Sequence, residues 1–389
     1  MNRPTELGGL TQWTDHTKVP YYVYYDPAIY AREMERIFYG PFWHPVALEA
    51  EIPNVNDFKT VTVGETPLIV MRTSADEAVV MVNACAHRGV QIVTEFRGQA
   101  TDFTCPYHAW SYDQCGNLMR VPGEERFPED FDKKHYGLRK LRTTWHGQVL
   151  WATFSDETPP IEEFLGEVSA SYMAAMGGGE RRLELLGYQK IIFNCNWKVY
   201  MDNDGYHAGL LHTAFRMLDY AGGKATLVAD GVGGSWGSHY GSKPIEDNGY
   251  LKDPSIITSM EADRTAAVNL IRPVTQAVKH LNTINFRFGR PLGPDKTEVH
   301  YCYLAFADDS PEIKQHKARQ AANFLGPSGF VSIEDGSMFE RVQKAIHAPG
   351  GQINFLKGLA ESPDGHYSLQ NDEAGNTPWW NDYRERMGL

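Results

Sequence analysis

The sequence of 389 residues predicts an α+β protein in which a small antiparallel β domain precedes a larger domain of sheet and helices. Between residues 41 and 155, short apolar runs such as FKTVTVG, PLIVMR and EAVVMVNA alternate with turn residues, which is the pattern of antiparallel strands. After residue 180, the strand-like runs YQKIIFN, HLNTINFRFGR and EVHYCYLAFA occur together with a long helical pattern, SPEIKQHKARQAANFL. We therefore expect the second domain to be a curved sheet packed against helices.

Local signals mark the ends of two expected helices. Pro27 follows Asp26 at the start of AIYAREMERIFYG, and Pro311 follows Ser310, so each proline fits a first helical turn. Ser310 is the expected N-cap of its helix. SDETPP at 155–160 and the glycines at 177–179 have the composition of linkers. The expected parts are a helical arm at 1–40 that packs on the second domain, a β domain at 41–156 and a second domain at 157–389.

The charge excludes two classes of partner. The 37 basic and 49 acidic residues give a net charge of −12, so there is no basic surface for nucleic acid or anionic lipid. Apolar stretches such as Val149–Phe154 are too short to span a bilayer. The N-terminal stretch MNRPTELGGLTQW lacks the apolar region of a signal peptide. We expect a cytoplasmic protein without a nucleic-acid or membrane partner.

Five cysteines occur, at positions 85, 105, 115, 195 and 302. An odd number of cysteines spread over a long chain does not indicate a disulfide framework, so we expect the cysteines to bind a metal or to be buried. Cys85 and His87, then seventeen residues, then Cys105 and His108 form a C-x-H and a C-x-x-H pair. Zinc accepts two Cys and two His, and a [2Fe–2S] cluster uses the same four residues with two Cys on one iron and two His on the other.

The order of the ligands favours the cluster, because zinc fingers usually pair Cys with Cys and His with His. The surrounding sequence, CAHRGVQ and TCPYHAW, resembles the Rieske fingerprint over roughly residues 41–155. Cys115 lies outside the pattern and is expected to be a structural thiol.

A second set of candidate ligands lies in NWKVYMDNDGYHAGLLHTAF, residues 196–215. His207 and His212 are five residues apart and diverge by roughly 140° on a straight helix, so one ion can bind both only if the helix bends or ends between them. Gly209 lies at that point. By themselves, two histidines near a carboxylate are more often satisfied polar residues than metal ligands.

A Rieske pattern followed by D-x-Y-H-x₄-H resembles the α subunit of the Rieske non-heme iron aromatic-ring hydroxylating oxygenases. The resemblance covers essentially the whole chain and is strongest to the branch of terephthalate dioxygenase and salicylate 5-hydroxylase, in TQWTDHTKVPYYVYYD, YHAGLLHTAF and ADDSPEIKQHKARQAANFLGPSGFVSIEDG. It implies a Rieske domain followed by a helix-grip catalytic domain, a [2Fe–2S] cluster and one mononuclear Fe(II). The implied iron ligands are His207, His212 and Asp335, with Glu334 as the alternative carboxylate.

The resemblance also gives Asp204 a role. In the family this position links a cluster-ligating His to an iron-ligating His across a subunit boundary, here His108 of one subunit and His207 of the next. It implies a homotrimer or an α3β3 assembly with a small β subunit. The family usually has two more residues between the Glu/Asp-Asn pair and this Asp, whereas Asn203 runs directly into Asp204. We therefore leave Asn203 out of the ligand set.

The implied function is that of a terminal oxygenase component. It takes electrons from a reductase or ferredoxin and uses O₂ to hydroxylate an aromatic substrate, in this branch an aromatic carboxylic acid. Arg287 falls where the branch places an arginine that holds the carboxylate, although a solvent-facing strand arginine is the competing interpretation. Where the terephthalate enzyme carries a second arginine this chain has Thr377, which favours a monoacid.

Three alternatives remain at this stage. One is a Rieske monooxygenase or demethylase that acts on a non-aromatic or quaternary-amine substrate. Another is an electron carrier of the Rieske ferredoxin type, which the roughly 230 residues after the cluster domain argue against. The last is a binding module stabilised by zinc.

Overall fold

A computed structural model describes residues 13–203, 225–230, 235–241, 249–260, 265–368 and 372–389. The chain divides into two compact units, Tyr39–Thr158 and a larger unit that joins Met1–Phe38 to Pro159–Leu389. The first unit is built from antiparallel strands and the second from a large antiparallel sheet with helices, so the expected α+β class is confirmed. Within the described residues, no helix is long and apolar enough to cross a membrane.

The smaller unit contains three antiparallel sheets, with strand orders β10-β11-β2, β5-β4-β3-β6 and β7-β8-β9. Their strands are β2 (His44–Leu48), β3 (Asp57–Val63), β4 (Thr66–Arg72), β5 (Ala78–Val82), β6 (Arg97–Gln99), β7 (Asp102–Thr104), β8 (Ser111–Asp113), β9 (Leu118–Arg120), β10 (Arg142–His146) and β11 (Val149–Thr153). The three runs predicted as strands from their alternation are β3, β4 and β5.

Strand β4 shows why this unit folds as it does, because it is buried on both faces. Ile69 and Met71 belong to one apolar core, and Leu68 and Val70 belong to another. Successive side chains of a strand point to opposite faces, so an uninterrupted apolar run serves two cores at once. The core that contains Ile69 also contains two of the cysteines discussed below.

The larger unit contains an eight-stranded antiparallel sheet with the order β12-β18-β17-β16-β15-β14-β13-β20. Its strands are β12 (Leu183–Phe193), β13 (Ala225–Asp230), β14 (Ser235–Gly241), β15 (Thr265–Ile271), β16 (Thr275–His280), β17 (Thr283–Pro291), β18 (Thr297–Phe306) and β20 (Tyr367–Ser368). The pair β1 (Lys18–Pro20) and β19 (Gln352–Asn354) forms a separate two-stranded sheet. The sheet expected after residue 180 is therefore present, with the runs at 188–194, 280–290 and 298–307 lying in β12, β17 and β18.

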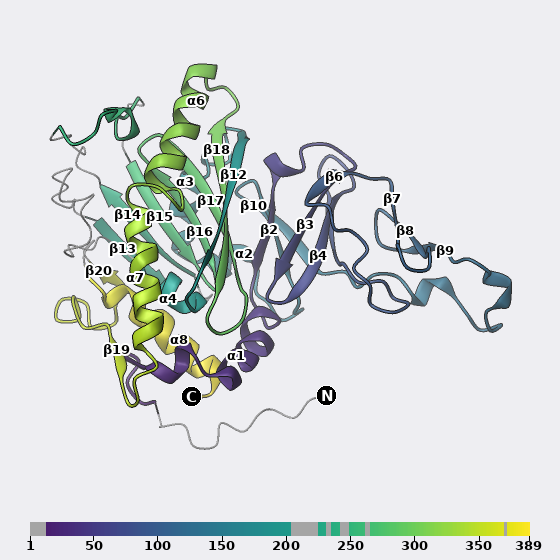
Figure 1. The fold of residues 1–389 in the computed structure, drawn as a ribbon, viewed down its shortest axis with the longest axis horizontal. Helices are drawn as coiled ribbons and strands as arrows, with labels where there is room; N and C mark the ends of the chain where they lie inside the picture. The colour runs from purple at the N-terminus through teal and green to yellow at the C-terminus, as the bar shows by residue number, and fades with distance from the viewer. Residues whose placement is uncertain (1–12, 204–224, 231–234, 242–248, 261–264, 369–371) are drawn as a thin grey trace. The chain divides into compact units, whose positions relative to one another are not determined.

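The helices of this unit are α1 (Pro27–Glu33), α2 (Ile161–Leu165), α3 (Val168–Ala175), α4 (Trp197–Met201), α6 (Pro311–Gln320), α7 (Ser332–Ala345) and α8 (Thr377–Met387). Helices α6 and α7 both pass in front of the sheet in the view of Figure 1. Helix α1 continues into a π-helical turn at Met34–Phe38, and α6 continues into another at Ala321–Leu325.

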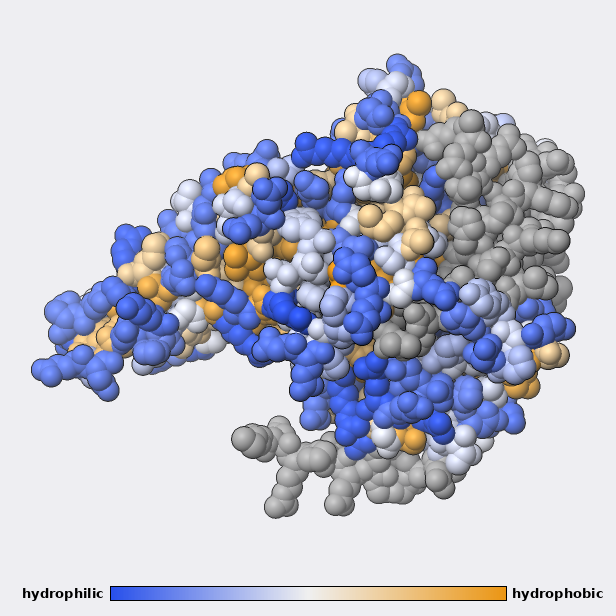
Figure 2. Space-filling model, turned by 180° about the vertical axis from the view of Figure 1, so that it is seen from behind, coloured by the Kyte–Doolittle hydropathy of each residue, from blue (hydrophilic) through white to orange (hydrophobic). Residues whose placement is uncertain are grey.

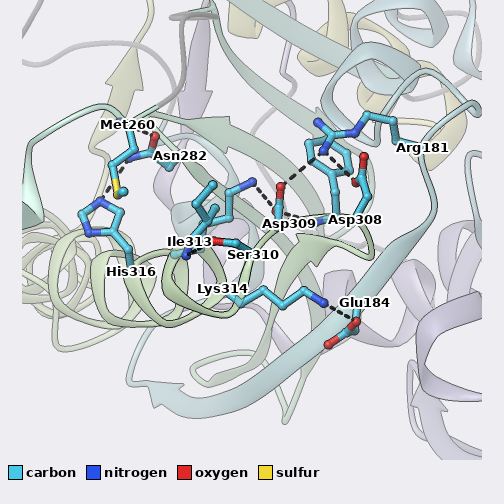
Figure 3. Close-up of polar contacts among 12 residues, drawn as sticks. Arg181, Glu184, Met260, Asn282, Asp308, Asp309, Ser310, Ile313, Lys314 and His316 are labelled. Atoms are coloured by element: carbon cyan, nitrogen blue, oxygen red, sulfur yellow. Dashed lines mark hydrogen bonds and ion pairs between the residues drawn. The ribbon is translucent and has the colours of Figure 1, made fainter.

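Both expected helix starts are confirmed. The Asp26 side chain accepts hydrogen bonds from the backbone N–H groups of Ala28 and Ile29, and Pro27 occupies the first turn. The Ser310 hydroxyl accepts from the N–H of Ile313 at 3.3 Å, which satisfies one of the free donors at the start of α6 (Figure 3). These two caps fix where the chain enters each helix.

The polar exterior agrees with the composition. On the face drawn in Figure 2, hydrophilic side chains dominate and apolar ones occur in small groups. Around the start of α6, charged side chains pair across neighbouring elements (Figure 3), for example Arg181 with Asp308 at 2.7 Å and Lys314 with Glu184 at 2.7 Å. Exposed pairs of this kind contribute at most about 1 kcal/mol each.

Candidate metal centres and active site

The predicted ligands of the smaller unit lie on two loops with the same backbone pattern. The N–H of Cys85 donates to the carbonyl of Val90, and the N–H of Cys105 donates to the carbonyl of Trp110. The carbonyl of Cys85 accepts a hydrogen bond from the N–H of Gly89, and the carbonyl of Cys105 accepts one from the N–H of Ala109. Gly89 and Ala109 both have a positive φ, of 71° and 56°. The two loops are thus built alike, and each carries one Cys and one His of the fingerprint.

The loops bring the two imidazoles together. The rings of His87 and His108 lie 4.6 Å apart between centroids, and His87 stacks on Trp110 at 4.9 Å with an interplanar angle of 7°. The Nδ1 atom of His108 is buried and has no hydrogen-bond partner among the described residues. Burial and the neighbouring His87 and Arg88 lower the pKa of His108, which favours the neutral form that binds a metal.

The two cysteines lie deeper than the histidines. Cys85 and Cys105 are free thiols, 3% and 2% exposed, in the same apolar core. The Sγ of Cys85 lies 3.2 Å from the Tyr112 hydroxyl, which also accepts a hydrogen bond from the N–H of Ala86. Two buried thiols and two adjacent imidazoles, carried by two loops of the same pattern, fit the mixed ligand set of a Rieske cluster.

In the part of the chain that the structure describes, no three His, Cys, Asp or Glu side chains converge as ligands of a single ion. A [2Fe–2S] cluster of this type has two protein ligands on each iron, so it does not require three side chains around a single ion. Asp204, His207 and His212 lie outside the described residues, so of the second set the structure describes the expected carboxylate and the expected substrate-binding arginine.

Asp335 lies in the first turn of α7, where the helix passes close to the sheet. Burial raises the pKa of Asp335 to about 7, against the opposing effects of the Arg287 charge and a hydrogen bond from Asn203. A Cβ added at Gly336 would lie 3.1 Å from the ring of Phe193 on β12, so glycine permits this close approach of helix and strand. The structure therefore brings together Asp335 and Arg287, two residues singled out from the sequence.

Arg287 belongs to a row of polar side chains that runs across four strands. Gln189, Tyr301, Arg287 and Gln276 are directly paired on β12, β18, β17 and β16. Directly paired residues point to the same face of a sheet. The carbonyl of Leu325 lies over this face and accepts from Arg287. Arg287 is thus half-buried on the sheet face that the Leu325 carbonyl covers.

The guanidinium of Arg287 is held in place by its neighbours. Its Nε donates to Asn285 Oδ1 at 2.8 Å, Nη1 to Gln276 Oε1 at 2.5 Å and Nη2 to the Leu325 carbonyl at 3.4 Å. The Tyr301 ring lies 4.7 Å from the guanidinium carbon. Within the described residues these bonds use three of the five N–H groups, and a planar guanidinium fixed in this way can present the others to a carboxylate.

Two residues on the same segment as Asp204 have contacts that the sequence analysis did not anticipate. Asn203, which we left out of the ligand set, lowers the pKa of the Asp335 carboxyl group. Asp202 is the C-cap of α4, and its carboxylate accepts hydrogen bonds from the Tyr24 hydroxyl and the Trp380 indole. The sequence signal for both residues was the match of Asp202 and Asn203 to the Glu/Asp-Asn pair of the family.

Comparisons with known proteins agree with this arrangement. Residues 42–140 match the family described as Rieske [2Fe-2S] domain, and residues 179–371 match the family described as Ring hydroxylating alpha subunit (catalytic domain). The large subunit of anthranilate 1,2-dioxygenase from Burkholderia cepacia is 36% identical over 96% of this chain and 94% of its own length. The second α subunit of the terminal oxygenase component of terephthalate 1,2-dioxygenase from Comamonas sp. is 32% identical over 97% of this chain and 98% of its own.

The fold has a solved counterpart as well. Naphthalene 1,2-dioxygenase from Rhodococcus sp., solved with bound indole, superposes with a TM-score of 0.81 over 95% of this chain and 94% of its own, at 23% identity. A cluster domain joined to this catalytic fold defines a Rieske non-heme iron oxygenase, an oxidoreductase. Within that class, the chain belongs to the α subunits of the ring-hydroxylating oxygenases, whose catalytic domain binds a mononuclear iron in addition to the [2Fe–2S] cluster. The zinc-module and ferredoxin-type alternatives are therefore excluded.

Proposed function

We propose that this chain is the catalytic subunit of a terminal oxygenase that hydroxylates an aromatic monocarboxylic acid. The observation that carries the proposal is Arg287, a cation fixed on the sheet face that the Leu325 carbonyl covers, whose charge lowers the pKa of Asp335. Its electrons come from a reductase or ferredoxin, and O₂ is the second substrate.

The metal ligands follow from the residues above. Cys85, His87, Cys105 and His108 hold the [2Fe–2S] cluster, because their loops supply two buried thiols and two adjacent imidazoles. Asp335 supplies the carboxylate of a two-His, one-carboxylate iron site, with His207 and His212 as its partners. Such a site activates O₂ at its open positions when iron is bound. Glu334 is the weaker candidate, because Asn203 and Arg287 both contact or face Asp335.

The chain's own residues bind and orient the substrate. Arg287 binds the carboxylate of the acid. The hydrogen bonds from Arg287 to Asn285 and Gln276 keep the guanidinium in the same position when the substrate binds. The Asn203 amide lowers the pKa of Asp335, which favours the charged carboxylate that binds a metal. A substrate anchored at one end presents one edge of its ring to the iron, which sets the position that is hydroxylated.

The relatives support this substrate class. Two relatives that match nearly the whole chain are named for anthranilate and terephthalate, both aromatic acids. Thr377, where a second arginine was expected in a dicarboxylate enzyme, is fully buried and donates its hydroxyl to the carbonyl of Ala374 at 2.7 Å. That side chain supplies no second cation, which favours a monoacid. A fixed guanidinium also disfavours a quaternary amine.

Asp204 is proposed as the bridge between His108 of one subunit and His207 of the next. A carboxylate that accepts hydrogen bonds from two metal-bound imidazoles provides a continuous path for the electron. It requires a closed ring of subunits, a homotrimer or an α3β3 assembly. The absence of a disulfide among the described cysteines and the need for a reductase fed by NAD(P)H fit the cytoplasm.

One experiment tests the proposed function. The purified protein, supplied with NADH and a reductase, is screened for O₂ uptake and hydroxylated product against aromatic monoacids, diacids and the matching uncharged amides. We expect about three irons and two labile sulfides per chain, and turnover of a monoacid but not of its amide. Stoichiometric zinc without labile sulfide, or a preference for the uncharged rings, would contradict the proposal.

A further inference from the structure

The amide of Asn285 is hydrogen-bonded through its oxygen but not through its nitrogen. Asn285 lies two residues before Arg287 on β17, so the two side chains occupy the same face of the sheet. Its Oδ1 accepts from the Nε of Arg287 at 2.8 Å, whereas its Nδ2 has no hydrogen-bond partner among the described residues. The residue is fully buried. Because a guanidinium only donates, Arg287 fixes the oxygen toward itself and leaves the amide N–H groups unpaired.

The residues beside Asn285 supply no acceptor for these N–H groups. Val278 on β16 and Tyr303 on β18 are its direct partners across the sheet. Val278 is apolar, and the Tyr303 hydroxyl donates to the Oε1 of Gln189. Buried amide groups in folded proteins nearly always have a hydrogen-bond partner, because an unpaired one costs free energy. The unpaired Nδ2, next to a fixed guanidinium, therefore points to an acceptor that arrives with a ligand.

The position of Nδ2 limits which atom of a ligand it can reach. The two polar atoms of an amide are about 2.2 Å apart, so Nδ2 lies no more than about 5 Å from the Nε of Arg287. In an aromatic acid, a carboxylate oxygen and an oxygen on the adjacent ring carbon are separated by about one hydrogen-bond length. An acid whose carboxylate is bound by Arg287 thus carries that second oxygen within reach of Nδ2, whereas substituents further round the ring lie too far away.

We propose that Asn285 is a specificity-determining residue, which selects an aromatic acid with a hydroxyl group on the ring carbon next to the carboxylate. The inference rests on the proposed function in one respect, that Arg287 binds the carboxylate. The hydroxyl donates its proton to the neighbouring carboxylate, which leaves its oxygen free to accept from Nδ2. A methyl group in the same place offers no acceptor and leaves the buried amide unpaired.

A second buried asparagine offers a matched control. Asn269, on β15, is also fully buried and also has one bonded and one unbonded polar atom. Its Nδ2 donates to the Ala277 carbonyl at 3.2 Å, while its Oδ1 has no partner in the described part of the chain. Asn269 is directly paired with Ala277, whereas Asn285 is paired with the next residue, Val278. Successive residues of a strand point to opposite faces, so Asn269 lies on the other face of the sheet.

The experiment measures the binding of 2-hydroxybenzoic acid and 2-methylbenzoic acid to the full oxygenase by isothermal titration calorimetry in the absence of O₂. The ratio of the two dissociation constants is compared between the wild type, Asn285→Leu, Asn285→Ser and Asn269→Leu. This ratio cancels any change that affects both acids equally, including a displaced Arg287. Asn285→Ser shortens the side chain but keeps it polar, so the test remains usable if Asn285→Leu does not fold.

We expect the wild type to bind the hydroxy acid about 5- to 50-fold more tightly than the methyl acid, the range for one hydrogen bond whose loss leaves a buried donor unpaired. This preference should fall to about twofold or less in both Asn285 variants and stay at the wild-type value in Asn269→Leu. A wild type without the preference, a preference that survives in both Asn285 variants, or its equal loss in Asn269→Leu would overturn the inference. Binding of 2-hydroxybenzamide as tightly as the acid would instead refute the proposed function.

Discussion

The hydroxyl oxygen of Tyr112 lies 3.2 Å from the Sγ of Cys85, inside the core of the cluster domain. The same oxygen accepts a hydrogen bond from the N–H of Ala86, so its own proton is directed to the sulfur. With a cluster bound, Cys85 is a thiolate, and a hydrogen bond to it withdraws negative charge. Hydrogen bonds to the sulfurs are one of the factors that set the potential of such clusters.

Tyr112→Phe should therefore lower the midpoint potential of the cluster. Loss of a hydrogen bond to a charged sulfur of about 1–1.5 kcal/mol corresponds to about 40–60 mV for one electron. The change is measured by spectroelectrochemistry on the purified oxygenase. The four ligands are untouched, so cluster content should stay at the wild-type level; an unaltered potential would mean that the hydroxyl does not bond to the ligand.

Asp204→Asn tests the proposed bridge between subunits. An amide accepts less well than a carboxylate from a metal-bound imidazole N–H and carries no charge to balance two of them. Both metal centres should be retained, the cluster should still be reduced by its partner, and its reoxidation with substrate and O₂ should slow by about tenfold or more. Stopped-flow absorbance measures this step. Reoxidation at the wild-type rate, or full activity of a monomer at high dilution, would contradict the bridge.

The lowered pKa of Glu298 leads us to predict that the stability of the fold depends on pH. Burial would raise its pKa, but hydrogen bonds from His300, Arg290 and Lys190 hold the pKa well below its usual range. A carboxyl group with a lowered folded-state pKa stabilises the fold above its unfolded pKa, and that stabilisation is lost as the pH falls through the folded value.

Glu298→Gln should accordingly lower the unfolding temperature at pH 7, and the difference from the wild type should shrink below about pH 4.5. Because Lys190 and Arg290 are partly exposed, we expect about 1 kcal/mol, or about 2–4 °C. Scanning calorimetry of both proteins across this pH range provides the comparison. A difference that grows as the pH falls would contradict the ion cluster.

The parts of the fold that the sequence predicted depend on local signals. Strands β3, β4 and β5 follow from alternation within seven residues or fewer, and the starts of α1 and α6 follow from an Asp or Ser before a Pro. Alternation and capping are fixed by neighbours in the chain, so they can be read without knowing the fold.

The parts of the site that the sequence analysis missed depend on distant contacts. Gln276 is recognisable as a partner of Arg287 only when the register of β16 against β17 is known. The partners of Asp202 could not be predicted, because Tyr24 and Trp380 lie 178 residues away on either side. Motif resemblance gave the expected ligands of the two metal sites, whereas the contacts of Arg287 and Asp202 required the structure.

Arg287 provides the sharpest test of the substrate class. Arg287→Gln removes the charge and the planar guanidinium with its paired N–H donors. Arg287→Lys keeps the charge but loses the guanidinium and its hydrogen bonds to Asn285 and Gln276. A hydrogen bond to a charged group is worth about 1.5–3 kcal/mol, so KM for the preferred aromatic acid should rise about 10- to 150-fold in Arg287→Gln. Arg287→Lys should fall between this variant and the wild type.

Arg290 supplies the control, since it is on the same strand but faces the other way and pairs with Glu298 at 2.8 Å. Arg290→Gln should leave KM for the acid unchanged. Steady-state O₂ uptake with the acid and with its amide separates the two effects, because the amide lacks the charge that Arg287 would bind. If Arg287→Gln lost activity equally with both compounds, the arginine would support the iron site rather than select the substrate. A rise in KM confined to the acid would identify Arg287 as the residue that binds its carboxylate.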